Sequence, residues 1–279
     1  MSQPADASSP LGVAFMVVLL ATGLVLLWRL VVSPAARARR QPAALTPWPG
    51  TSSDLLFFFL LATCGGICLP VLAGLGIRHA ALSQGARQIV NLAAFQLGGL
   101  GGIAVYHFCV RRRQPVPPAR PAGIWLSGLA TVLIALPLVQ GVAVLWQALL
   151  GACGLPVETA DNIQIFMGLP TLLLRILFAV LAVVVVPIGE ELIFRAGLFR
   201  YFRGRFPRWA AVLVPALVFG AMHLMSAPLQ SLSSFAPLVM LAVVLSLAYE
   251  RTGRIGTTMV AHGLFNLLTV ILIELGVST

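Results

Sequence analysis

The C-terminal half of this 279-residue chain places ionisable and amide side chains inside long apolar segments. An ionisable group at membrane depth costs about 2.5–3.5 kcal/mol or more, so each such group needs a functional or structural reason. Carboxylates and imidazoles transfer protons and bind metals, and amides donate hydrogen bonds to developing negative charge. The candidates for a reactive site are Glu190, Glu191, Arg195, His223, His262 and Asn266.

The spacing of these residues places them in pairs on helical faces. Residues four apart in a helix project from the same face, so Glu191 can neutralise Arg195 within one helix. Glu190 is rotated by about 100° from Glu191 and is free to face another helix. Two further pairs share the four-residue spacing: Phe219 with His223, and His262 with Asn266.

Distances along the chain predict that the candidates lie at similar depths. Glu190 and His223 are equally far from the turn at residues 204–207, so an antiparallel helix pair folded there brings them level. His262 lies about eight residues, or about 12 Å of helix, beyond the next turn. Asn266 lies one helical turn deeper. We expect all four groups to converge in the cytoplasmic half of the membrane.

Two kinds of hydrolytic chemistry fit this set. A carboxylate and an imidazole that share one water form a general base, while a second imidazole and an amide stabilise an oxyanion. Alternatively, Glu190, His223 and His262 could hold a divalent metal such as zinc that acidifies the water. Both would hydrolyse an acyl bond; a buried polar network that only ties helices together is the structural alternative.

The metal-free chemistry uses the residues more economically. With three residues taken as zinc ligands, the remaining base would be Glu191, which is better occupied with Arg195. Asn266 is a poor zinc ligand but a good oxyanion partner. No HExxH motif occurs and no Asp lies within a predicted span, which disfavours the usual zinc-protease helix and a paired-aspartate protease. We therefore favour a mechanism without a cofactor and keep zinc as the alternative.

Three motifs in this order resemble the CAAX-protease and bacteriocin-processing family, also called the Abi family. They are EExxxR at 190–195, FxxxH at 219–223 and HxxxN at 262–266. The resemblance covers about residues 171–279. It implies an intramembrane endopeptidase open to the cytoplasm, of which the best-known members trim the last three residues from prenylated proteins.

The resemblance also assigns roles to individual residues. It implies that Glu190 and His223 activate the water and that His262 and Asn266 stabilise the oxyanion or complete the site. The supporting residues would be Glu191, Arg195 and Phe219. Members of the family are described both as metalloproteases and as metal-independent glutamate proteases, so the resemblance leaves the cofactor open.

The composition requires a membrane protein. Hydrophobic residues make up 59% of the chain and charged residues 9%, whereas a soluble domain carries about 25% charged residues. Apolar runs long enough to cross a bilayer of about 30 Å recur throughout. We expect an all-α polytopic transmembrane helical bundle of about eight spans, with the active site within the C-terminal five. The expected spans are Leu11–Val32, Leu55–Ile77, Ile89–Val110, Gly123–Leu150, Thr171–Phe199, Trp209–Met225, Phe235–Tyr249 and Ile255–Val277.

The distribution of arginine predicts the orientation of the spans. With the N-terminus outside, the loops 33–54, 111–122, 200–208 and 250–254 become cytoplasmic and hold thirteen of the 18 arginines, against two in the outside segments. We therefore expect an integral protein of the bacterial cytoplasmic membrane with both termini outside. The arginines lie between apolar segments rather than on one face, so nucleic-acid binding is not expected despite a net charge of +10.

The linkers and motifs predict two regions and a function. We expect an N-terminal three-span region with Pro- and Arg-rich cytoplasmic linkers over residues 1–122, and a catalytic membrane domain over 123–279. The predicted function is that of an intramembrane endopeptidase acting on a membrane-associated or lipid-modified peptide or protein in the lipid bilayer. The alternatives are a non-catalytic scaffold or bacteriocin-immunity protein of the same fold, and a transporter.

Overall fold

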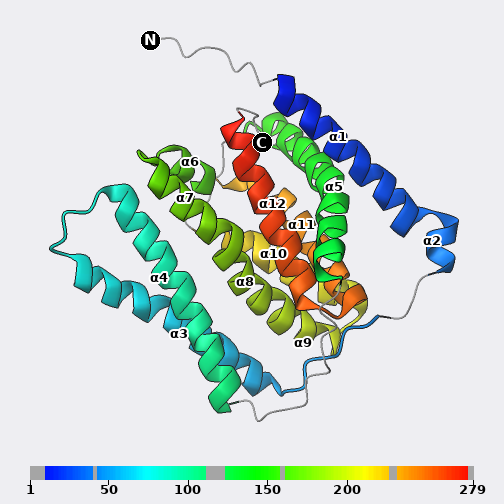
Figure 1. Cartoon of the computed structure of the whole chain (residues 1–279). Coiled ribbons are helices and arrows are strands. Elements are labelled where there is room, and N and C mark those ends of the chain that lie inside the picture. The colour runs from blue at the N-terminus through cyan, green and yellow to red at the C-terminus, as the bar shows by residue number, and fades with distance from the viewer. Residues whose placement is uncertain (1–9, 40–42, 111–122, 158–160, 226–230, 276–279) are drawn as a thin grey trace.

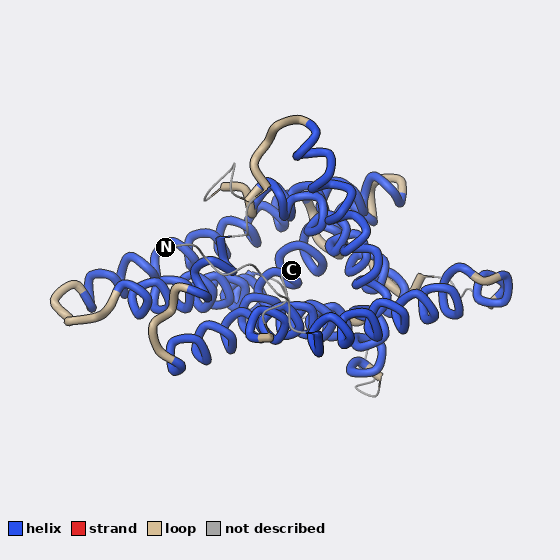
Figure 2. The backbone as a smooth tube through the Cα atoms, turned by 90° about the horizontal axis from the view of Figure 1, so that it is seen from above, coloured by secondary structure: helices blue, strands red, loops and turns tan. Residues whose placement is uncertain are grey.

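The computed structural model of the chain describes residues 10–39, 43–110, 123–157, 161–225 and 231–275. These residues form helices joined by short connections, and none of them belongs to a strand (Figures 1 and 2). The predicted all-α polytopic bundle is therefore confirmed.

The helices before the motifs include two π-helical segments, labelled η. They are α1 (Pro10–Leu27), η1 (Trp28–Val32), α2 (Pro34–Ala38), α3 (Ser52–Ile77), α4 (Gln84–Val105), η2 (Tyr106–Val110), α5 (Ile124–Ala152) and α6 (Asp161–Met167).

The helices that carry the motifs follow. The first is one long, nearly continuous helix made of α7 (Leu172–Val180), η3 (Leu181–Val185), α8 (Val186–Glu190), η4 (Glu191–Phe199) and α9 (Arg200–Arg203). The others are α10 (Arg208–Met222), α11 (Leu232–Thr252) and α12 (Ile255–Glu274).

Polar side chains at the helix starts explain where several spans begin. Thr51 and Asp54 form a capping box at α3, in which each side chain bonds the backbone N–H of the other residue. Ser83 accepts a hydrogen bond from the backbone of α4, and Thr171 does the same for α7. Each cap satisfies a backbone donor that has no partner within its helix.

Seven helices, rather than eight, are long and apolar enough to cross a membrane in the part of the chain that the structure describes. The exception is the sixth expected span, Trp209–Met225, which forms the 15-residue helix α10. At 1.5 Å per residue, α10 is about 22 Å long, short of the hydrocarbon thickness of about 30 Å. The apolar run continues through Leu224 and Met225, but the helix ends at Met222, so hydropathy overestimated its length.

The outer surface of the bundle is apolar. Large hydrophobic side chains are widely exposed on separate helices, among them Leu172, Leu145 and Trp125, each more than 70% exposed. A soluble protein does not leave so much apolar surface in water, whereas lipid covers it at no cost. The chain is an integral membrane protein.

Three of the four arginine-rich loops meet at one end of the bundle. The segment 43–50 crosses this end, where the Ala44 N–H donates to the Glu250 carbonyl (3.1 Å) and the Arg205 guanidinium donates to the Gly50 carbonyl (2.9 Å). The fourth loop, 111–122, lies outside the described residues. This common end agrees with the predicted grouping of the loops; the side of the membrane that it faces stays a prediction.

Candidate active site

The two adjacent glutamates lie where the helix changes from α to π geometry. Glu190 ends α8 and Glu191 begins η4. The side chain of Glu190 is 19% exposed, while that of Glu191 is fully buried. π-Helical turns are rare and often occur at functional sites, because they redirect neighbouring side chains. One helix thereby presents Glu190 to a partly open site and Glu191 to the protein interior.

Glu191 forms a buried ion pair with Arg195. The Arg195 Nη1 atom lies 2.9 Å from the Glu191 Oε1 atom, and both side chains are at most 1% exposed. The guanidinium also lies over the ring of Phe219, 4.8 Å from its centroid. This is the ion pair that the four-residue spacing predicts, and it neutralises the arginine at membrane depth.

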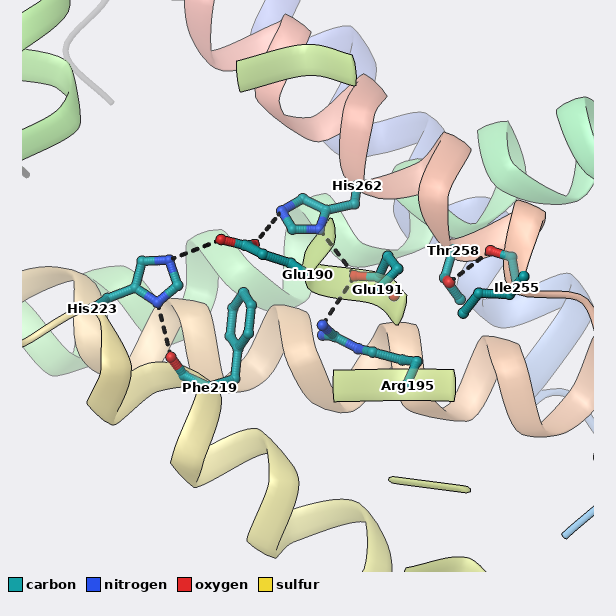
Figure 3. Close-up of polar contacts among 8 residues, drawn as sticks. All are labelled: Glu190, Glu191, Arg195, Phe219, His223, Ile255, Thr258 and His262. Carbon is teal, nitrogen blue, oxygen red and sulfur yellow. Dashed lines mark hydrogen bonds and ion pairs between the residues drawn. The ribbon is translucent and has the colours of Figure 1, made fainter. Parts of the chain in front are cut away.

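His262 is held by the same carboxylate. Its Nδ1–H donates to Glu191 Oε1 over 2.9 Å, and the side chain is 4% exposed. With the proton on Nδ1, a neutral ring has its lone pair on Nε2. This Nε2 atom lies 3.6 Å from Glu190 Oε2, so Glu191 aims His262 at Glu190 (Figure 3).

His223 approaches Glu190 from the opposite side. It follows the last residue of α10, and its Nδ1 lies 2.8 Å from the Phe219 carbonyl oxygen. A carbonyl accepts only, so Nδ1 carries the hydrogen and a neutral ring presents the Nε2 lone pair. That atom lies 4.0 Å from Glu190 Oε1, and the side chain is 35% exposed. Figure 3 shows the Glu190 carboxylate between the two imidazoles.

Phe219 forms the apolar base of the site. Its ring is fully buried and lies 4.8 Å from the ring of His223 and 6.1 Å from that of His262, centroid to centroid. Its edge-to-face contact with Phe194 ties α10 to η4. Phe219 therefore limits the movement of both histidines, and its carbonyl orients one of them.

Asn266 contacts the backbone of the helix that carries the glutamates. Its Nδ2 donates to the Ala182 carbonyl in η3 over 2.7 Å. One turn away, a Cβ on Gly263 would lie 2.5 Å from the Val183 carbonyl oxygen, so α12 packs closely on η3 at this point. The structure thus places the Asn266 amide on a backbone carbonyl rather than on Glu190 or His223. This contact fixes α12, and with it His262, against the glutamate helix.

A known protein family matches the part of the chain that carries this site. Residues 171–268, which contain all three motifs, match the family model described as type II CAAX prenyl endopeptidase Rce1-like. This C-terminal region is similar to the CAAX-protease and bacteriocin-processing family. The match confirms the resemblance drawn from the motifs.

One curated relative of the CAAX-protease-like region is the UPF0177 protein YbdI of Lactococcus lactis subsp. lactis (strain IL1403). The two are 29% identical over 92 residues, which cover 33% of this chain and 46% of that protein. The chain therefore spans about half the length of this relative. No solved structure matches the chain.

The separations around Glu190 in this CAAX-protease-like site are longer than those between the ligands of a bound zinc ion. Donor atoms around a tetrahedral zinc, with bonds of about 2.0–2.1 Å, stand about 3.4 Å apart. The Glu190 oxygens stand 3.6 and 4.0 Å from the two Nε2 atoms. Among the described residues, no group of three His, Cys, Asp or Glu side chains is arranged to hold a metal ion. We assign no step to a metal.

The bond between His262 and Glu191 was missed from the sequence. The four-residue spacing paired Glu191 with Arg195 and His262 with Asn266, each within its own helix. The structure instead joins Glu191 to His262 across 71 positions of sequence. A carboxylate and an imidazole at similar depth were the available signal, because a buried carboxylate accepts more than one donor.

Proposed function

We propose that the chain is an intramembrane endopeptidase that hydrolyses a peptide bond of a membrane-associated or lipid-modified substrate. The observation that carries the proposal is the position of the Glu190 carboxylate between the Nε2 atoms of His223 and His262. The name of the matching family model, a CAAX prenyl endopeptidase, supports a lipid-modified substrate.

The nucleophile would be a water shared by Glu190 and His223. Their 4.0 Å separation is too long for a direct hydrogen bond, and a water can bridge two polar groups at such a distance. The water oxygen would form a bond with the peptide carbonyl carbon while its proton passes to Glu190. His223, fixed through Nδ1 by the Phe219 carbonyl, would accept a hydrogen bond from the second O–H of the water, which stays on the oxygen, and so orient the attack.

The negative charge that develops on the carbonyl oxygen needs a donor. His262 is held through Nδ1 by Glu191, so its Nε2 atom is the one that faces the reaction. As an imidazolium, protonated on both nitrogens and balanced by the two glutamates, it would donate a hydrogen bond from Nε2 to the oxyanion. The buried Arg195 adds positive charge behind this pair. Breakage of the C–N bond would then return the proton from Glu190 to the leaving amine.

A site that only joins helices would be arranged differently. Structural networks in a membrane interior close into direct hydrogen bonds, because an unpaired polar group in hydrocarbon is costly. The Glu191–His262 and Asn266–Ala182 contacts do so, at 2.9 and 2.7 Å. Glu190 is instead partly exposed and 3.6–4.0 Å from both histidines, which favours a reactive carboxylate over a scaffold.

The test compares the proteomes of membranes that express the native chain or Glu190→Gln. We expect new C-termini or fragments with the native chain and none with the variant. Glu274→Gln is the matched control, because Glu274 is an exposed glutamate at the far end of α12 from the site. Identical fragments with and without Glu190 would favour the alternative of a non-catalytic scaffold or immunity protein.

A further inference from the structure

Gln96 is a polar residue in the middle of a membrane span, and neither the motifs nor the mechanism uses it. It is the thirteenth residue of the 26-residue span Gln84–Cys109. Its side chain is partly buried and makes no hydrogen bond to any residue that the structure describes. An amide that leaves water without a partner costs a few kcal/mol, roughly 1–3 by protein measurements, so its place in the span requires an explanation.

The residues that share a helix face with Gln96 show which part of the protein this face packs against. Gly85, Ile89, Leu92 and Gln96 follow one another at helical spacing on one face of α4. The first three pack on the glutamate-bearing helix or on the segment before it through apolar contacts. The fourth residue on this face, Gln96, is an amide instead. It packs against the backbone at Gly189, because a Cβ built on Gly189 would lie 2.9 Å from Gln96 Oε1. Figure 1 shows α4 beside α7 and α8.

The amide of Gln96 therefore lies beside the residue that precedes the proposed catalytic glutamate in the sequence. Gly189 immediately precedes Glu190, and a side chain at this position would displace the Gln96 amide from where it lies. The α3–α4 hairpin lies outside the region that matches the family model, which begins at residue 171. Next to Glu190, the N-terminal half therefore meets the active-site helix with a polar side chain.

We propose that Gln96 binds the unwound backbone of the substrate beside the bond to be cut. The inference rests on the proposed endopeptidase function. A peptide must leave its helical hydrogen bonds to expose a carbonyl to attack, and in a membrane its free N–H and C=O groups then need protein partners. A glutamine amide offers one acceptor and two donors and can pair with both groups of a peptide unit.

The other polar groups of the site are already engaged. Glu190 and His223 face the reaction, His262 is bonded to Glu191, and Asn266 is bonded to the Ala182 carbonyl. Gln96 is the nearby amide whose hydrogen-bonding capacity is unused within the described residues. Because Gln96 would form hydrogen bonds with the substrate backbone rather than with its side chains, it would position substrates of varied sequence.

The experiment uses the full chain in membranes and compares the native protein with Gln96→Leu and Asn91→Leu. Asn91 is the matched control, because it is an amide on the same helix that is exposed rather than turned to α8. The termini whose formation depends on Glu190 are quantified by proteomics. We expect their rate of formation to fall about two- to tenfold in Gln96→Leu, the effect of one ordinary hydrogen bond, and to be unchanged in Asn91→Leu.

A second measurement separates substrate binding from helix packing. In the Glu190→Gln background, the uncut precursors of those same fragments should co-purify with the protein, and adding Gln96→Leu should reduce the amount retained without lowering the unfolding temperature in detergent. Native rates in Gln96→Leu, or lower rates with full retention of the precursors and a lower unfolding temperature, would overturn the inference. Fragments that do not depend on Glu190 at all would instead remove the protease proposal, and this inference with it.

Discussion

The Nδ1 atom of His262 lies 2.9 Å from the carboxylate of Glu191, the neighbour of the proposed catalytic glutamate. Two adjacent glutamates thus have different surroundings: Glu191 is buried between Arg195 and His262, and Glu190 is partly exposed between two imidazoles. The same helix supplies the proposed base and the group that aims the histidine opposite it. This relationship leads to distinct expectations for the two residues.

Glu190→Gln should abolish the formation of cleavage products and leave the fold intact. The amide keeps the size of the side chain but accepts no proton from water, and the neighbouring Glu191 pairs remain in place. Product formation in membranes and thermal unfolding in detergent test this together. A large loss of thermal stability in this variant would show that Glu190 is a structural residue.

Glu191→Ala should lower both activity and stability. The change strands a fully buried Arg195 and releases His262, and removal of one partner of a buried pair typically costs about 3–5 kcal/mol. The unfolding temperature in detergent is the measurement, with Glu190→Gln as the comparison. Purely catalytic losses of equal size in both variants would contradict this division of roles.

Asn266→Leu should lower stability together with activity. The variant leaves the Ala182 carbonyl without its 2.7 Å donor, and an unsatisfied buried group costs about 1–3 kcal/mol. Because Asn266 joins α12 to η3, the loss would also displace His262 from Glu190. If activity falls while the unfolding temperature stays the same, Asn266 acts on the oxyanion directly, as the family resemblance implies.

The purified active protein should retain its activity after exhaustive chelation. The 3.6 and 4.0 Å separations around Glu190 suit a shared water better than a common tetrahedral metal. Elemental analysis of the same preparation shows whether zinc is present. Stoichiometric zinc that is lost together with activity, and that restores it on return, would make Glu190, His223 and His262 metal ligands.

Cysteine labelling in intact cells should place the arginine-rich end inside. We expect single cysteines near positions 45, 117, 205 and 252 to be protected from an impermeant reagent and cysteines at both termini to be labelled. The four native cysteines must first be replaced, because those at 64, 68, 109 and 153 are exposed on the protein surface. Labelling of position 117 from outside would reverse the predicted orientation.

The features that depend on a single helix could be predicted from the sequence. Long apolar runs specify spans because each backbone group in lipid must be paired within its own helix. The four-residue spacing specified the Glu191–Arg195 ion pair for the same local reason. The approximate depth of the four candidate residues followed from counting along helices, and the structure brings Glu190, His223 and His262 together.

Tertiary structure alone decided how the candidates are divided between chemistry and support. The rotation and approach of α12 depend on its packing against η3 at Gly263, and this packing places His262 on Glu191 and Asn266 on Ala182. The π-helical segments η3 and η4 alter the 100° spacing on which sequence periodicity relies. The early end of α10 and the approach of Gln96 to Gly189 likewise depend on packing between helices that are far apart in the chain, which no local pattern records.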